Sequence, residues 1–104
     1  MLTLVTGATG FLGEFVIRRL SRAGRPLAGF VRPTSDTVTL TALGVEIRTG
    51  DLADCDSLAQ AMAGVETLVN LASLGFGHAP NLVRAAREAG VRRAVFIGTT
   101  AVFT

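Results

Sequence analysis

The sequence predicts an α/β protein with a doubly wound parallel sheet of five strands in the order 3-2-1-4-5. Two observations support this prediction. Short apolar runs alternate along the chain with amphipathic segments, as expected when helices cover both faces of a parallel sheet. The first apolar run leads directly into a GxxGxxG pattern over residues 7–13, and such a pattern between a strand and a helix is typical of doubly wound folds.

The N-terminal segment predicts a strand over residues 2–5, then a glycine loop, then a helix from Phe11 to Ala23. Apolar side chains recur on one face of this helix, and Gly24 ends it. We expect the inner face to contain Leu12, Phe15, Val16, Ile17 and Leu20. The loop glycines let the backbone turn tightly and approach a ligand, and the positive end of the helix faces that ligand. This arrangement predicts a pyrophosphate site.

The next apolar run, Leu27–Val31, predicts a buried second strand, and Arg32 follows it. A dinucleotide site usually has an acidic residue here, about 20 positions after the glycines, to bind the ribose 2′-hydroxyl. An arginine cannot accept a hydrogen bond from that hydroxyl, but it can donate two parallel hydrogen bonds to a 2′-phosphate. The sequence therefore favours NADP(H), with NAD(H) as the second candidate. The alternative is a solvated arginine at a strand end.

The rest of the chain continues the alternation of helix and strand. After a loop from Arg32 to Asp36, helices are predicted over residues 37–43, 54–63 and 80–89, each followed by a glycine. Strands are predicted over residues 45–48, 67–71 and 94–98. Asp54 is placed to cap a helix. The inner face of the last helix is expected to contain Leu82, Val83, Ala86 and Ala89.

Ligands of a doubly wound sheet bind at the carboxyl ends of the strands, where the strand order reverses. The predicted loops at those ends cover residues 7–13, 32–35, 50–52, 72–77 and 99–101. We expect these loops to converge on one crevice.

The composition argues against several classes of protein. The 104 residues suit one domain, and an apolar content of 49% is enough for a core. No apolar run has the length of a membrane span, and there is no basic leader with a cleavage site, which favours a cytoplasmic protein. The single cysteine, Cys55, excludes an internal disulfide and fits no metal motif. The arginines are dispersed and there is no tyrosine or tryptophan, so nucleic-acid binding is disfavoured.

Five segments carry a family resemblance: Thr6–Gly13, Val31–Asp36, Gly50–Leu52, Asn70–Ser73 and Arg93–Phe103. In this order they resemble the motifs of extended and atypical short-chain dehydrogenases/reductases, a group that includes nucleotide-sugar epimerases/dehydratases. The second segment is similar to that of NADP-preferring members. The resemblance implies that residues 1–104 form an NAD(P)-binding Rossmann domain whose substrate-binding, C-terminal half is absent.

The resemblance also implies roles for individual residues. The implied cofactor contacts are Gly7, Thr9, Gly10, Phe11, Leu12, Gly13, Arg32, Asp51, Leu52, Leu71, Ala72 and Ser73. Asp51 and the residue after it match the element that contacts adenine, although Asp51 can also be a turn residue. Thr99 matches the catalytic hydroxyl that hydrogen-bonds the reacting oxygen, with Thr100 as the alternative in a shifted register. Both threonines can instead satisfy local backbone groups, and His78 is expected to cap a helix.

The acid–base pair of the family has no counterpart in this sequence. That pair is Tyr-x-x-x-Lys, in which the lysine lowers the pKa of the tyrosine so that the phenolate accepts a proton near neutral pH. The sequence contains no tyrosine and no lysine. We therefore expect the chain to be the N-terminal portion of a longer protein, or a truncated reading frame. The fifth strand should then leave an open sheet edge, which favours self-association.

Two classes of function remain in competition. In the first, the chain is the NADP(H)-binding portion of an oxidoreductase or a nucleotide-sugar epimerase/dehydratase, which transfers a hydride at a carbonyl or alcohol carbon in its full-length form. A small-molecule substrate is expected only with the missing half. In the second, the chain is a non-catalytic NAD(P)-binding sensor or assembly module, as departures from the family at Phe103 and Thr104 suggest. A domain for another nucleotide or a flavin is least favoured.

Overall fold

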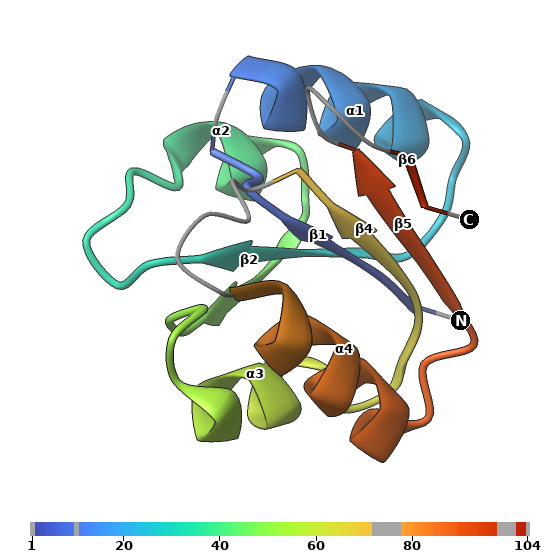
Figure 1. The fold of residues 1–104 in the computed structure, drawn as a ribbon. Helices are drawn as coiled ribbons and strands as arrows, with labels where there is room; N and C mark the ends of the chain where they lie inside the picture. The colour runs from blue at the N-terminus through green and yellow to red at the C-terminus, as the bar shows by residue number, and fades with distance from the viewer. Residues whose placement is uncertain (1, 10, 72–77, 98–101, 104) are drawn as a thin grey trace.

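The computed structural model describes residues 2–9, 11–71, 78–97 and 102–103. Figure 1 shows one sheet between two layers of helices. The strands are β1 (Leu2–Thr6), β2 (Leu27–Val31), β3 (Glu46–Thr49), β4 (Val65–Asn70), β5 (Arg93–Ile97) and β6 (Val102–Phe103). The helices are α1 (Phe11–Arg22), α2 (Val38–Ala42), α3 (Cys55–Ala61) and α4 (His78–Ala89).

The sheet has the order β3-β2-β1-β4-β5-β6. All neighbours from β3 through β5 are parallel, so the predicted order 3-2-1-4-5 is confirmed. The strand order reverses between β1 and β4, where Thr6 lies in register with Asn70. The second strand has the predicted bounds, whereas β4 begins at Val65 rather than at Thr67. The predicted place for a ligand is therefore the end of β1.

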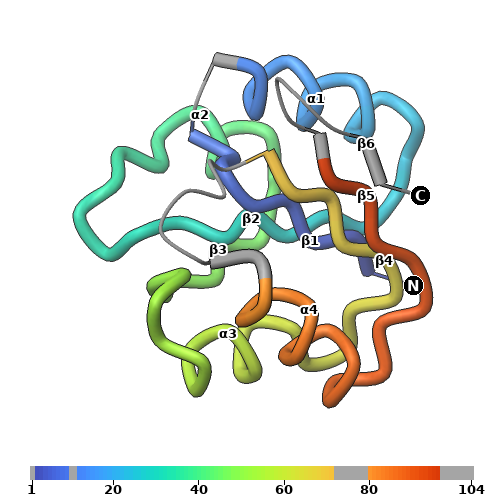
Figure 2. Tube along the Cα trace, in the orientation of Figure 1, coloured from blue at the N-terminus to red at the C-terminus, as the bar shows by residue number. Residues whose placement is uncertain are grey.

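The far edge of β5 is partly covered by the chain itself. β6 pairs with β5 in antiparallel fashion, with Phe96 opposite Phe103 and Ile97 opposite Val102. The prediction that the fifth strand leaves its edge open is therefore wrong at these positions. Because a strand edge presents unpaired backbone N–H and C=O groups, a short segment of β-prone residues that folds back can satisfy them. Figure 2 traces the chain through the described helices and strands in the same orientation as Figure 1.

Each face of the sheet carries its own core. Leu4 and Leu68 are fully buried against α3 and α4, where they meet Leu58, Met62 and Leu82. Val5 points to the opposite face and packs with Ile17 of α1 and Leu40 of α2. Successive residues of a strand point to opposite faces, so β1 contributes to both cores. Full burial of a leucine-sized side chain contributes about 1.5–3 kcal/mol.

The predicted inner faces of two helices are partly wrong. Leu12 and Phe15 of α1 are 46% and 58% exposed, whereas Ile17 is fully buried. The apolar stripe of α1 is wider than its contact with β1 and β2, so only one side of the stripe is covered. Val83 of α4 is 38% exposed, and Ala85 takes the buried place instead.

The ends of the helices follow the predicted capping chemistry. The Asp54 carboxylate accepts hydrogen bonds from the backbone N–H groups of Asp56 and Ser57. The glycines predicted to end helices all have positive φ, namely Gly24, Gly44, Gly64 and Gly90. The C-terminal end of α3 has an additional cap, because Arg48 of β3 donates to the carbonyl oxygens of Ala61 and Ala63 at 2.7 and 2.6 Å.

Three further features of the described residues bear on possible functions: the cysteine, potential metal ligands and the length of the helices. Cys55 is a free, half-buried thiol at the first residue of α3. No three metal-ligating side chains gather among the described residues. None of the described helices is long and apolar enough to span a membrane.

Candidate cofactor site

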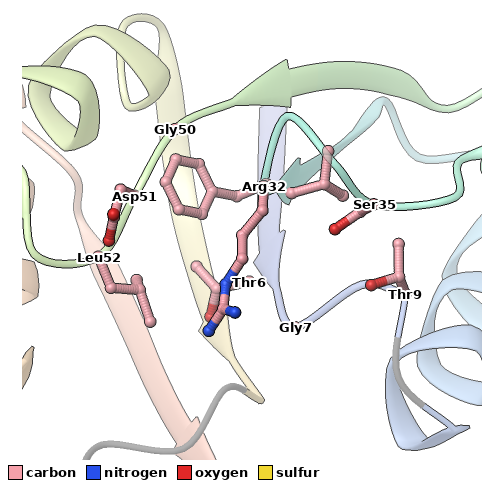
Figure 3. A pocket seen from close by; sticks show the side chains of 10 residues that line it. Thr6, Gly7, Thr9, Arg32, Ser35, Gly50, Asp51 and Leu52 are labelled. Atoms are coloured by element: carbon pink, nitrogen blue, oxygen red, sulfur yellow. The ribbon is translucent and has the colours of Figure 1, made fainter.

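A cavity of about 290 Å³ lies at the carboxyl ends of β1, β2 and β3. Half of its lining residues are predicted cofactor contacts, namely Gly7, Thr9, Arg32, Asp51 and Leu52. Figure 3 shows the glycine loop on one side of the cavity and Asp51–Leu52 on the other. Three of the predicted loops therefore meet at one crevice. The other two loops, 72–77 and 99–101, lie outside the described residues.

The glycine loop brings the start of α1 against the end of β1. The backbone at Gly7 has a φ of 71°, a conformation that residues other than glycine rarely adopt. A Cβ atom at Gly13 would lie 2.1 Å from the carbonyl oxygen of Gly7, so only glycine fits in this place. The close packing directs the first turn of α1, with its unpaired backbone N–H groups, towards the loop. This geometry suits an anion such as a pyrophosphate.

A buried polar pair fixes the floor of the cavity. The Thr6 hydroxyl donates a hydrogen bond to the side-chain oxygen of Asn70, and both residues are almost fully buried. The backbone N–H of Leu71 also donates to the Thr6 carbonyl oxygen at 3.1 Å. These bonds join β1 and β4 where the strand order reverses. Thr6 also lines the cavity. The sequence did not indicate its bond to Asn70, because the two residues are 64 positions apart.

Arg32 is exposed at the end of β2, where it begins a turn closed by a 3.0 Å hydrogen bond from Ser35 N–H to the Arg32 carbonyl oxygen. Figure 3 shows its side chain extending across the cavity. The ion pairs found among the described residues belong to Arg18 and Arg48. Arg32 has no carboxylate partner in that part of the chain, so its guanidinium donors face the cavity free to bind an anion.

The opposite wall is the turn that follows β3. The Asp51 carboxylate accepts from Ala53 N–H at 2.9 Å, and the Asp51 carbonyl oxygen accepts from Asp54 N–H at 3.0 Å. One carboxylate oxygen thus supports the turn, and the other has capacity for a ligand donor. Leu52 and the ring of Phe30 add an apolar surface to the same wall. A flat aromatic ligand fits such a combination of apolar surface and one acceptor.

The remaining predicted contacts lie elsewhere or are not described. Leu12 is on the exposed side of α1, Gly13 packs beneath the loop, and Leu71 packs against the core beside Val5. The side chain of Phe11 is not described. Gly10, Ala72, Ser73, Thr99 and Thr100 lie outside the described residues. Sequence patterns did not single out Ser35 or Phe30, which line the cavity from β2 and its turn.

A family model described as NAD(P)H-binding matches residues 7–104. The chain belongs to the NAD(P)H-binding family. Its similarity to a curated relative, sterol demethylase protein B of Methylococcus capsulatus, is 40% identity over 91% of this chain and 33% of the relative. The family match agrees with the position of the cavity at the glycine loop. The predicted Rossmann fold and the predicted NAD(P)H cofactor are thereby confirmed.

Two solved structures of reductases are similar to this member of the NAD(P)H-binding family. Citrobacter sp. triphenylmethane reductase complexed with NADP(H) has 34% identity and a TM-score of 0.81, over 94% of this chain and 37% of that chain. The quinone oxidoreductase QOR2 of Escherichia coli complexed with NADPH has 29% identity and a TM-score of 0.74, over 92% and 36%. The predicted resemblance to epimerase- and reductase-type proteins is confirmed, and these similarities do not favour the non-catalytic alternative. The chain spans about a third of the length of the curated relatives it matches.

Proposed function

We propose that this chain binds the adenosine 2′-phosphate end of NADPH within a reductase-type protein. The observation that supports the proposal best is the position of Arg32, which lines the cavity between the glycine loop and Asp51–Leu52 without a carboxylate partner among the described residues. An NAD-specific site would need a carboxylate at this place to accept from the 2′-hydroxyl. The NADP(H)-bound neighbours named above support the same preference.

Each part of the cavity then has a role in binding. The backbone of the glycine loop and the start of α1 hold the pyrophosphate. Arg32 donates hydrogen bonds to the 2′-phosphate, and the Ser35 hydroxyl on the same turn adds a donor. Adenine lies against Leu52 and Phe30, with its amino group towards Asp51. All the cofactor contacts predicted from the sequence stay predictions, including those of Gly10, Phe11, Leu12, Leu71, Ala72 and Ser73.

The bound cofactor would supply a hydride to a carbonyl carbon or accept one from an alcohol carbon. Thr99 is our candidate for the hydroxyl that hydrogen-bonds the reacting oxygen, with Thr100 as the alternative. Reduction of the carbonyl also needs a proton donor, and oxidation of the alcohol needs a proton acceptor. The sequence contains no tyrosine or lysine for either purpose. Residues 1–104 are thus proposed as an incomplete NAD(P)-binding domain, which binds cofactor without turning over a substrate.

Calorimetric titration of the purified chain with NADPH and with NADH tests the proposal. We expect tighter binding of NADPH, and Arg32→Ala should weaken NADPH binding by about tenfold or more, with little change for NADH, because a charge-assisted hydrogen bond contributes about 1.5–3 kcal/mol. Arg25→Ala is a matched control, since Arg25 is also an exposed arginine and lies in the loop before β2. Equal affinity of the wild-type chain for both cofactors would contradict the role of Arg32.

A further inference from the structure

The Asp51 turn is held from behind by a side chain of α3. The Ser57 hydroxyl oxygen accepts a hydrogen bond from Asp51 N–H at 3.0 Å. The same oxygen lies 3.1 Å from the carbonyl oxygen of Asp51 and 2.9 Å from that of Asp54. A hydroxyl has one proton and two acceptor lone pairs, so it donates to one of these carbonyls at a time while it accepts from Asp51.

Capping of α3 does not account for the contacts of Ser57 with Asp51. The Asp54 side chain already caps the helix, since its Oδ1 accepts from the N–H groups of Asp56 and Ser57 at 3.0 and 3.4 Å. In a capping box, the side chain at the position of Ser57 would reach back to the N–H of the N-cap residue. Here the hydroxyl instead reaches past the cap to Asp51, which lines the cavity.

Gly50 makes room for this contact. A Cβ atom at Gly50 would lie 2.9 Å from the Ser57 hydroxyl oxygen and 2.7 Å from the ring of Phe30. Phe30 is 5% exposed and lines the cavity. The absence of a side chain at Gly50 therefore lets the hydroxyl and the ring approach the turn together.

A second side chain holds the same turn from α4. The Asn81 side-chain amide donates to the carbonyl oxygen of Leu52 at 3.2 Å. The backbone on both sides of the Asp51–Leu52 peptide is thus fixed by side chains, one from each helix of this face. A carboxylate that must accept from a ligand donor gains from such fixation, because less freedom is lost on binding.

We propose that Ser57 is a positioning residue that holds the Asp51 carboxylate towards the 6-amino group of adenine. This inference rests on the proposed function. An amino group donates to a carboxylate, whereas the carbonyl oxygen at the same place in hypoxanthine is an acceptor and is repelled by it. Ser57 therefore sets the selectivity of the site for adenine over hypoxanthine through the backbone of Asp51, without touching the base.

The test compares NADPH with its hypoxanthine analogue, reduced deamino-NADP, by calorimetric titration of the wild-type chain and of Ser57→Ala. We expect the wild-type chain to prefer NADPH by about tenfold or more, since a hydrogen bond to a charged group is lost in the analogue. Ser57→Ala should bring that ratio close to one. Ser57→Thr, which keeps the hydroxyl, should retain most of the preference. Ser21→Ala is the matched control, because Ser21 lies at the far end of α1.

The selectivity ratio separates positioning from a general loss of stability. A folded Ser57→Ala chain that keeps the wild-type ratio would overturn the inference, even if both affinities fall together. If Ser57→Ala does not fold, Asn81→Ala tests whether the side chains that fix the Asp51–Leu52 backbone set the selectivity. A folded Asn81→Ala chain that loses the preference for NADPH supports the inference, and one that keeps the wild-type ratio overturns it. A wild-type chain that binds neither compound would contradict the proposed function itself.

Discussion

The first wall of the cavity, lined by Gly7 and Thr9, is shaped by close packing of backbone atoms, whereas the second wall, residues 50–52, is held in place by side chains. On the first wall, Gly13 packs against the carbonyl of Gly7 with no room for a Cβ atom. On the second wall, Ser57 and Asn81 fix the backbone of Asp51 and Leu52 through hydrogen bonds. The first wall therefore depends on the absence of side chains, and the second depends on their presence.

This difference explains how each wall tolerates change. Backbone atoms packed against backbone atoms cannot move without unfolding their helix or strand, so an added methyl group on the first wall has nowhere to go. Side chains that hold a turn can adopt other rotamers, at a moderate cost. We expect substitutions on the glycine wall to have the larger effects.

The largest effect is expected from Gly13→Ala. The new Cβ atom would lie 2.1 Å from the Gly7 carbonyl oxygen and 2.8 Å from backbone atoms of Ala8. We predict a loss of about 3 kcal/mol or more in the free energy of unfolding, together with loss of NADPH binding. Urea unfolding and calorimetry measure the two effects. Ser21→Ala in the same helix is the control, and a Gly13→Ala chain as stable as this control would contradict the close packing.

A smaller effect is expected from Gly50→Ala on the opposite wall. Its Cβ atom would meet the Phe30 ring at 2.7 Å and the Ser57 hydroxyl at 2.9 Å, and both are side-chain atoms that can shift. We predict a loss of about 1–2 kcal/mol in the free energy of unfolding, with weaker binding of NADPH. A loss equal to that of Gly13→Ala, measured under the same conditions, would remove the distinction between the two walls.

The smallest effect is expected from Thr6→Val on the floor between the walls. This substitution keeps the shape of the side chain but removes the donor to the buried Asn70 oxygen. We predict a loss of about 1 kcal/mol in the free energy of unfolding, because a buried acceptor loses one partner. An unchanged midpoint and slope in urea unfolding would show that this bond contributes nothing to stability.

The same contrast separates what the sequence could predict from what it could not. Gly7 and Gly13 are recognisable because their spacing follows from backbone geometry that is local in the chain. Arg32 is recognisable by its distance from these glycines. Asp54 was predicted as a cap from local chemistry, and the structure confirms it.

Contacts between distant residues escaped prediction. The bond between Thr6 and Asn70 joins residues 64 positions apart, and no local pattern indicates it. The exposure of Leu12 and Phe15 was also missed, because periodicity locates an apolar stripe but not the width of the surface that covers it. Likewise, the pairing of β6 with β5 depends on a reversal of the chain that the sequence pattern did not indicate.

The most direct test is a crystal structure of the chain with adenosine 2′,5′-bisphosphate, which carries the adenine and the 2′-phosphate without the nicotinamide. We predict that the 2′-phosphate lies about 3 Å from the guanidinium of Arg32, a usual distance for a charge-assisted hydrogen bond. We also predict that the adenine lies against Leu52, with its amino group at Asp51. A 2′-phosphate directed away from Arg32, or a ligand bound outside this cavity, would contradict the proposed NADPH site.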